Sequence, residues 1–266
     1  MNFMTKSLFT VISISVLSFP AFSAEPSEDV SASSTLDEII VTARKREESL
    51  LDISESVSAI SGSDIEDQNI KGLDKVGLLI PNLNLAMRAD GYPNVSIRGI
   101  GAFGLTQGVG FYLDDVQLFS DASSRFGDLD RIEVLKGPQG ILYGGSNIGG
   151  AVKFVSKRPS AEEGLTGKVK YQTGEQGISD TEVSVNVPLQ GDWAMRVFAF
   201  SRDDDGFIKN PNSDGIDNQP TNVGAYSQDG TRISIAGSIS DNLSLYASVR
   251  RNEYLGPVNA WARELG

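Results

Sequence analysis

The pattern of hydrophobic and polar positions changes near Pro159. After this residue, apolar and polar side chains alternate along several runs, and an alternation of period two predicts β-strands. The strands that they indicate are about ten residues long, and tilted strands of this length could cross a membrane. The alternation itself covers Lys168–Thr173, Thr181–Val187, Trp193–Arg202, Arg232–Ile239 and Leu243–Arg250.

The connections between these runs indicate the direction of crossing. Gln190-Gly191 and Ser240–Asn242 are tight turns on one side, whereas Gly174–Gly177 and the long polar loop Asp203–Gly230 fall on the other. Outer-membrane barrels have short periplasmic turns and longer extracellular loops. The pattern therefore fits antiparallel transmembrane strands entered from the periplasm, with a soluble antiparallel β-domain as the alternative. Only Trp193–Arg202 has a ragged alternation, because its arginines and phenylalanines share one parity.

Before Pro159 the pattern is mixed and predicts a small α+β domain. Ser63, followed by Glu66, resembles a capping box and predicts a helix start. Asp74–Ile80 predicts a second helical segment that ends at Pro81. Strands are expected at Val57–Ile60, Leu83–Met87, Asn94–Arg98, Gly110–Leu113, Arg131–Leu135 and Ala151–Val155.

The last two of these strands flank a glycine-rich stretch. Glycine at high density marks backbone with positive φ or a close approach of two chain segments. The sequence therefore predicts a β-hairpin with a long, glycine-rich bend. Its glycines are Gly137, Gly140, Gly144, Gly145, Gly149 and Gly150.

Two glycine patterns invite comparison with nucleotide-binding loops. Gly99–Gly104 fits G-x-G-x-x-G, but Leu105–Gly110 is too rich in glycine to open the helix that such a site requires. Gly137–Gly150 lacks the Gly-Lys-Ser/Thr ending of a phosphate-binding loop. We therefore expect no nucleotide site.

Composition excludes several classes of function. The 266 residues carry a formal net charge of −12, which argues against a nucleic-acid partner. The chain contains neither cysteine nor histidine, so disulfides, thiolate chemistry, a Ser-His-Asp triad and most zinc sites are excluded. We expect no cofactor and no metal.

The N-terminus predicts export. Lys6 is the only charge before Glu25, Leu8–Phe19 is apolar, and Ala21-Phe22-Ser23 offers a signal-peptidase site, so residues 1–23 are interpreted as a signal peptide. Glu25–Thr35 has the composition of a disordered segment. The strand-forming island Asp37–Ala43 follows it, and could either dock on this protein or be offered to a partner as an added strand.

These segments together resemble TonB-dependent outer-membrane receptors, in the family's order and over nearly the whole chain after the signal peptide. Asp37–Ala43 is similar to the TonB box, although Glu38 stands where many members carry threonine. Leu129–Gly140 is similar to the most recognisable run of the plug domain, Leu-(Asp/Glu)-Arg-Ile-Glu-Val-Leu-(Lys/Arg)-Gly-Pro-x-Gly. Further similar segments are Ser96–Gly99, Phe111–Val116, Tyr143-Gly144 and Gly149–Val152.

The resemblance implies an α+β plug domain followed by antiparallel transmembrane β-strands of an incomplete 22-stranded β-barrel. The expected divisions are a signal peptide (1–23), a disordered segment with the TonB box at 37–43 (24–53), the plug (54–160) and about five barrel strands (161–266). At about 18 residues per strand, 22 strands need roughly 390 residues. Because residues 160 to 266 number only 107, we expect a fragment that alone neither inserts nor transports.

The resemblance also implies a function and its residues. It implies an outer-membrane, non-enzymatic receptor that imports a scarce nutrient such as a metal chelate, with a ferric siderophore as the leading candidate. TonB is expected to bind the box as an added strand, through Asp37, Glu38, Ile39, Ile40, Val41, Thr42 and Ala43. The plug motif comprises Arg98, Gly99, Arg131, Glu133, Lys136, Gly137, Pro138, Gly140, Gly149 and Gly150. Of these, the four charged residues are expected to face a polar lumen and to help hold the plug to the barrel wall.

Two alternatives stay open at this point. One is a periplasmic plug-like domain that binds or signals without transport. The other is a secreted hydrolase, with Asp114 and Asp115, or Asp203, Asp204 and Asp205, as candidate acids. Adjacent carboxylates on a strand point to opposite faces, so the first pair is poorly suited to acid–base catalysis. Asp203, Asp204 and Asp205 are interpreted as the start of a solvated loop rather than as a calcium site, because the ordered spacing of an EF-hand loop is missing.

Overall fold

The computed structural model describes two five-stranded sheets, three two-stranded sheets and three helices. The described residues are 40–42, 48–49, 56–70, 73–87, 93–101, 108–118, 127–144, 147–175, 177–206, 208–209, 222–223 and 225–255. The predicted signal peptide and the box positions Asp37, Glu38, Ile39 and Ala43 lie outside these residues. None of the described helices is long and apolar enough to span a membrane.

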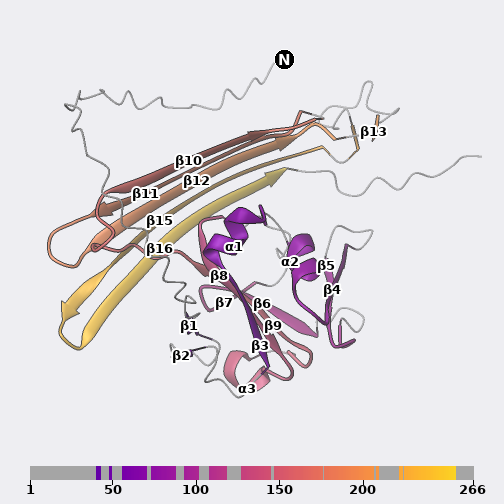
Figure 1. Cartoon of the computed structure of the whole chain (residues 1–266), viewed down its shortest axis with the longest axis horizontal. Coiled ribbons are helices and arrows are strands. Elements are labelled where there is room, and N and C mark those ends of the chain that lie inside the picture. Colours follow the sequence, from indigo (N-terminus) through magenta and orange to yellow (C-terminus); the bar gives the residue numbers. More distant parts are fainter. Residues whose placement is uncertain are drawn as a thin grey trace, which may run out of the picture. The chain divides into compact units, whose positions relative to one another are not determined.

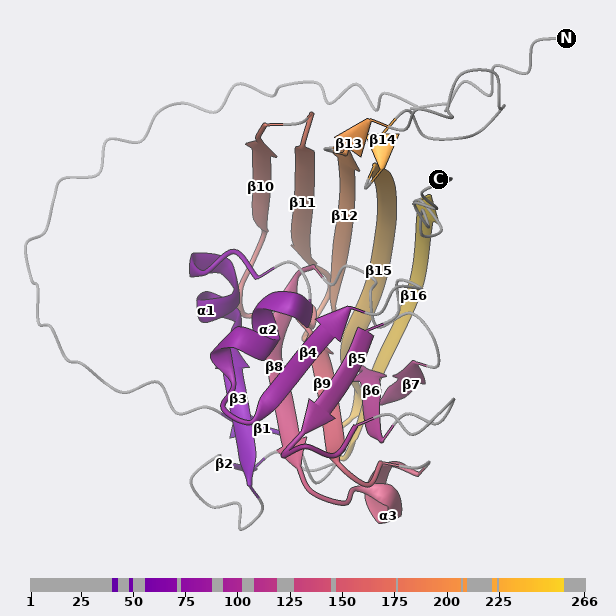
Figure 2. The ribbon, with the colours of Figure 1, turned by 90° about the vertical axis from the view of Figure 1, so that its right-hand side faces the viewer.

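A five-stranded mixed sheet forms the centre of the N-terminal domain (Figure 2). Its strands, in spatial order, are β3 (Val57–Ser61), β8 (Leu129–Lys136), β9 (Gly150–Ser156), β6 (Val109–Leu113) and β7 (Val116–Leu118). The pair β6–β9 is parallel, and the other pairs are antiparallel. Strands β8 and β9 confirm the predicted hairpin around the glycine-rich bend, which also contains the unpredicted short helix α3 (Gly140–Tyr143).

Helices α1 (Gly62–Asp67) and α2 (Leu73–Leu79) follow β3, as predicted. The predicted cap of α1 is wrong by two residues. Ser61 rather than Ser63 is the N-cap, and its hydroxyl accepts a hydrogen bond from the Asp64 amide at 3.1 Å. Ser61 has an extended backbone and ends β3, so the helix begins one residue after the strand. Strands β4 (Leu83–Met87) and β5 (Pro93–Ile97) form a separate antiparallel pair.

The two faces of the N-terminal sheet have different roles. Ile132 and Val134 of β8 point into the main apolar core, which also includes Val76 of α2. Leu135, which has the opposite parity on β8, points to a smaller cluster that contains Val41. Successive side chains of a strand alternate between faces, so Arg131 and Glu133 lie on the same face as Leu135.

The C-terminal sheet contains five antiparallel strands in sequence order (Figure 1). They are β10 (Thr166–Thr173), β11 (Ser179–Pro188), β12 (Ala194–Asp204), β15 (Tyr226–Ser240) and β16 (Leu243–Leu255). The predicted loop Asp203–Gly230 is too long at both ends, because the β12–β15 ladder continues to the pair Asp204↔Tyr226. The short strands β13 (Ile208–Lys209) and β14 (Asn222–Val223) pair within that connection.

The C-terminal sheet has an inverted distribution of polarity. Polar side chains are buried on it, among them Asn186, Arg196 and Arg232, whereas Val169 and Val249 are 72% and 76% exposed. A strand that alternates a polar inner face with an apolar outer face is typical of barrel walls in outer membranes. The ragged parity of Trp193–Arg202 has the same origin, because Arg196 and Phe198 both lie on the buried face of β12.

Candidate functional site

The short strand β1 (Ile40–Val41) docks on the N-terminal domain. It pairs with β2 (Glu48–Ser49) through the partners Ile40↔Ser49 and Val41↔Glu48. Val41 is fully buried in the small cluster with Leu135, whereas Ile40 is 49% exposed. The burial of one side chain and the exposure of the next are the expected consequence of strand alternation.

Thr42, the residue after β1, has all its polar atoms bonded to the domain. Its amide donates to Oε1 of Glu133 at 2.8 Å, and its hydroxyl lies 3.2 Å from the same oxygen. The hydroxyl accepts from Nζ of Lys153 at 2.6 Å and from Nη2 of Arg131 at 3.2 Å. Its carbonyl accepts from Lys153 at 3.3 Å and from the Tyr143 hydroxyl at 3.4 Å. One donor and two acceptor sites exhaust a hydroxyl, so this one is fully used.

We call Arg131, Glu133, Tyr143 and Lys153 the Thr42 cradle. Glu133 and Lys153 are direct cross-strand partners on β8 and β9, and their side chains are 0% and 1% exposed. Arg131 lies two residues before Glu133, hence on the same face, and its Nε binds Oε1 of Glu133 at 2.7 Å. Tyr143 ends α3, so the glycine-rich bend supplies the fourth member.

The charges of the cradle are paired, as buried charges need to be. Lys153 contacts Oδ1 of Asp115 at 2.8 Å in addition to Thr42, so its three N–H donors have three acceptors. Burial raises the pKa of the Tyr143 hydroxyl, and the negative charges of Glu133 and Asp115 raise it further. Tyr143 therefore keeps its proton and can donate to the Thr42 carbonyl.

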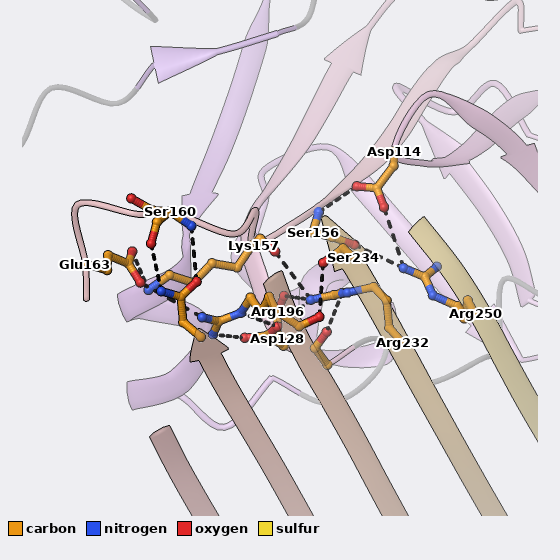
Figure 3. A network of polar contacts seen from close by, with 12 residues as sticks. Asp114, Asp128, Ser156, Lys157, Ser160, Glu163, Arg196, Arg232, Ser234 and Arg250 are labelled. Carbon is orange, nitrogen blue, oxygen red and sulfur yellow. Dashed lines mark hydrogen bonds and ion pairs between the residues drawn. The ribbon is translucent and has the colours of Figure 1, made fainter. Parts of the chain in front are cut away.

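A second polar cluster joins the N-terminal domain to the C-terminal sheet (Figure 3). Asp128, just before β8, accepts two hydrogen bonds from Arg196, from Nε at 2.8 Å and from Nη2 at 2.5 Å. Arg232 binds the same carboxylate and also the Asp128 carbonyl, at 3.2 Å. These three side chains, which we call the Asp128 cluster, are at most 7% exposed. A bidentate, buried contact of this kind fixes both distance and orientation.

Comparisons with known proteins identify the family. The TonB-dependent Receptor Plug Domain family matches residues 49–151. Residues 49–151 of this chain are therefore a TonB-dependent receptor plug domain. It is 26% identical over 239 residues to the vitamin B12 transporter BtuB of Vibrio vulnificus, covering 87% of this chain and 38% of that protein. It is 27% identical over 173 residues to the ferrioxamine receptor of Yersinia enterocolitica, covering 61% of this chain and 23% of the receptor.

The fold comparison agrees with the sequence comparison. The crystal structure of the ferric yersiniabactin uptake receptor FyuA from Yersinia pestis superposes with a TM-score of 0.64 at 21% identity, over 74% of this chain and 31% of that one. The predicted fold class, a plug followed by antiparallel strands of an unclosed barrel, is therefore confirmed. The chain spans less than half the length of these relatives, which are receptors and transporters rather than enzymes.

The structure places the predicted plug residues in different surroundings. Arg131 and Glu133 belong to the cradle, whereas Nη2 of Arg98 donates to the Ser56 hydroxyl at 2.9 Å. Burial and the nearby Arg98 lower the pKa of Lys136. The described bonds of Arg98, Arg131 and Glu133 lie within the plug and the box, so their expected contact with the barrel wall stays a prediction. Gly99 follows β5 and has positive φ. Pro138 and the other motif glycines lie along the bend: Gly137 and Gly150 have positive φ, Gly140 begins α3, and the Gly149 carbonyl accepts from the Gly137 amide.

The plug residues that do contact the C-terminal sheet were missed by the sequence analysis. Asp128 and Asn69 were assigned no role, and Glu66 was considered only as part of a capping box. Asn69 and Glu66 bind Lys170 and Lys168 of β10, respectively. One signal was present, because the ragged parity around Arg196 marked a charge on the buried face of a strand.

The candidate acids of the hydrolase alternative do not form a catalytic pair. Asp114 and Asp115 lie in the turn between β6 and β7 and not on a strand, so the expected reason for their separation is wrong. They nevertheless face different partners, Arg250 and Lys153. Asp203 and Asp204 end β12 instead of beginning a loop. Within the described residues, no three acidic side chains are grouped to hold a metal ion.

Proposed function

We propose that this chain acts in TonB-dependent uptake of a small nutrient across the outer membrane, with Asp37–Ala43 as the strand that TonB binds. The match of residues 49–151 to the plug domain of TonB-dependent receptors supports the class of function. The observation that carries the TonB assignment is the bonding of Thr42. In the described part of the box, Thr42 is held by hydrogen bonds and its neighbour Val41 is buried, and such contacts can be exchanged for those of an added strand.

The docked box and a TonB-bound box would compete for the same backbone groups. Strand addition requires free N–H and C=O groups along the box. In this structure the Thr42 amide and carbonyl are bonded to the cradle, and β1 is paired with β2. The exposed side chain of Ile40 offers a starting point from which TonB could displace the remaining bonds.

The proposed location is the outer membrane, reached through the predicted signal peptide. The exposed apolar side chains of the C-terminal sheet, among them Val169, Ile233 and Val249, support a lipid-facing outer surface. Because the chain alone is expected not to insert, fractionation of cells that express it as part of a complete receptor tests the proposal. Recovery in the soluble periplasm would contradict it and favour the periplasmic binding domain.

A ferric siderophore is the proposed ligand class. The ferrioxamine and ferric yersiniabactin receptors support this class, whereas the similarity to a vitamin B12 transporter supports the alternative of a corrinoid. Tryptophan fluorescence measures the binding of ferrioxamine B and of cyanocobalamin to the whole chain. Its result distinguishes the siderophore class from the corrinoid class. The chain has two tryptophans, so quenching can be assigned by single Trp→Phe variants.

Direct binding tests the TonB assignment. The periplasmic domain of TonB is titrated into the whole chain in detergent, and separately into a variant of the chain that lacks residues 37–43. We expect the deletion to abolish binding. A matched deletion of seven residues, 27–33 in the preceding acidic segment, should leave binding intact. Unchanged binding after removal of 37–43 would reject the assignment.

A further inference from the structure

A cavity of about 290 Å³ lies beside the Thr42 cradle. Its lining comes mainly from the end of β9, the residues that follow it, the turn between β6 and β7, and Tyr246 of β16. At about 30 Å³ per water, the space corresponds to roughly ten waters. Pockets that enclose drug-sized ligands measure about 300–1,000 Å³, so this cavity lies just below their range. It is suited to a molecule much smaller than the siderophore or corrinoid proposed above.

Four acidic and four basic side chains line the cavity, and each of the four acids contacts a cation. The contacts are Asp114 with Arg250, Asp115 with Lys153, Asp130 with Arg131, and Glu163 with Lys157. The fourth lining base, Arg158, contacts no carboxylate among the described residues. The acids and bases of the lining balance, so net charge does not attract an anion here. The N–H donors of Arg158, however, are left for another partner.

The side chain of Arg158 stacks on Tyr246. Its Cζ lies 4.8 Å from the centroid of the Tyr246 ring, which is a cation–π contact. A guanidinium that stacks through its face keeps the N–H donors along its edge, and this edge matches the paired oxygens of a carboxylate or a phosphate. The Tyr246 hydroxyl is buried and has no hydrogen-bond partner among the described residues. A second polar group of the lining is therefore unsatisfied, which indicates a polar ligand.

The backbone on both sides of Arg158 is fixed (Figure 3). Before it, the Lys157 amide donates to the Asp128 carbonyl at 2.9 Å. After it, the amide and the carbonyl of Ser160 bond to the side-chain amide of Asn186, at 3.1 and 2.7 Å. These bonds place Arg158 before a ligand arrives, so binding costs little conformational entropy.

Lys157 offers a second cation. Its Nζ lies 3.4 Å from Oε1 of Glu163, and the two side chains are 42% and 36% exposed. An ion pair with this exposure contributes little to stability, so the ammonium can turn to a ligand at low cost.

We propose that this cavity binds a small oxyanion, a phosphate or a di- or tricarboxylate, with Arg158 as the principal contact and Lys157 as a second. The stacked guanidinium supplies two parallel donors, and the ammonium adds a charge beside them. Tyr246 holds the guanidinium in place from below. The site is separate from that of the transported nutrient, because the cavity is too small for it. The proposal does not depend on the TonB assignment.

Equilibrium dialysis tests the proposal. The whole chain in detergent is dialysed against radiolabelled inorganic phosphate and, separately, against radiolabelled metal-free citrate. Sodium chloride keeps the ionic strength constant, so that screening of surface charge is equal in all samples. We expect one anion bound per chain at saturation. Binding of citrate alone assigns the site to carboxylates, and binding of phosphate alone assigns it to phosphates. If neither anion binds, the proposal is rejected.

Arg158→Gln should weaken the binding at least about tenfold, as expected for the loss of hydrogen bonds to a charged group. Arg251→Gln is the matched control, because Arg251 is an arginine of β16 that is 76% exposed and paired with Glu253. Its substitution should change the affinity less than about twofold. The site is rejected if Arg158→Gln binds as tightly as the parent chain, or if Arg251→Gln weakens the binding equally.

Two further substitutions separate the fork from its charge and its support. Arg158→Lys keeps the charge but lacks the planar fork, so its affinity should lie between those of Arg158→Gln and the parent chain. This variant also provides the comparison if Arg158→Gln fails to fold. Tyr246→Phe keeps the ring beneath Arg158, whereas Tyr246→Leu removes it, and we expect the larger loss for leucine. Equal losses would contradict the positioning of Arg158 by the ring.

Discussion

Thr42 and Glu133 are 91 residues apart in sequence, yet the amide and the hydroxyl of Thr42 both bind one carboxylate oxygen of Glu133, at 2.8 and 3.2 Å. Glu133 belongs to the most recognisable plug run, and Thr42 belongs to the proposed TonB box. Two motifs that the sequence shows as separate therefore form one site. The carboxylate recognises the backbone of the box as well as its side chain, so part of this contact is independent of the residue at position 42.

The Thr42 hydroxyl should contribute measurably to docking. Thr42→Val keeps the shape of the side chain but removes three hydrogen bonds and leaves Lys153 and Arg131 each with one acceptor fewer. We expect the free energy of docking to fall by about 1–3 kcal/mol. Hydrogen exchange of the residue 42 amide should accelerate accordingly. Thr42→Ser retains the hydroxyl and is the control, and equal exchange in the two variants would contradict a role for the hydroxyl.

Among the charged residues at the junction with the C-terminal sheet, Asp128 should cause the largest loss of stability when it is substituted. Asp128→Asn fits the left-handed backbone, φ 54°, but removes the charge between two buried arginines. We expect a loss of about 3–5 kcal/mol in the free energy of unfolding, measured by thermal denaturation of the chain in detergent.

Glu163→Gln is the control for this prediction. Glu163 also lies near Arg196, but at 3.9 Å and with 36% of its side chain exposed, so its loss should change stability by less than about 1 kcal/mol. Equal effects of the two substitutions would show that burial of the Asp128 cluster adds nothing to the free energy of unfolding.

The strands could be predicted because burial on one side imposes a period of two on the sequence. The β8–β9 hairpin and the five strands of the C-terminal sheet could be predicted for this reason. The residues at which these strands begin and end could not. The extension of β15 back to Tyr226 depends on a partner in β12, which local polarity does not reveal. The cap of α1 was misplaced for a similar reason, since the end of β3 at Ser61 depends on its pairing with Arg131 of β8.

The candidate site could be predicted only in part. The strand-forming character of Asp37–Ala43 and the plug motif were visible, and docking was one of two open outcomes for the box. That Thr42 meets Glu133 and Lys153 was not visible, because three elements about 100 residues away must fold before the cradle exists. The pairing of Asp128 with Arg196 and Arg232 is equally non-local, although a charge at an apolar parity hinted at it.

The glycines of the bend should differ in their tolerance to substitution. A Cβ at Gly150 would lie 2.1 Å from the Leu135 carbonyl oxygen, and the backbone has φ of +141°. At Gly137, φ is +110° but no atom lies within 4 Å of the added Cβ. Gly150→Ala must therefore displace backbone inside the sheet, whereas Gly137→Ala meets only conformational strain of about 1–3 kcal/mol. Thermal denaturation should show a clearly larger loss for Gly150→Ala, and a reversed order would contradict the close approach of β8 and β9.

Tyr143 should make the stability of the plug depend on alkaline pH. Burial, followed by the charges of Glu133 and Asp115, raises the pKa of Tyr143 above its value in the unfolded chain, about 10. The contribution of this neutral phenol to stability is complete below pH 10. Above that pH the unfolded state releases the proton first and binds fewer protons than the folded state, so stability falls as the pH rises.

Tyr143→Phe removes this titration, and its free energy of unfolding should decline less steeply above pH 10 than that of the parent chain. An absorbance titration at 295 nm gives a second measurement, in which the variant should lose one late-ionising tyrosine of the seven. Tyr112 is the internal control, because burial also raises its pKa and it is retained in the variant. If the free energy of unfolding fell with pH equally steeply in the variant and the parent chain, Tyr143 would ionise as freely in the folded plug as in the unfolded chain. The hydrogen bond that it donates to Thr42 would then add nothing to the hold on the box.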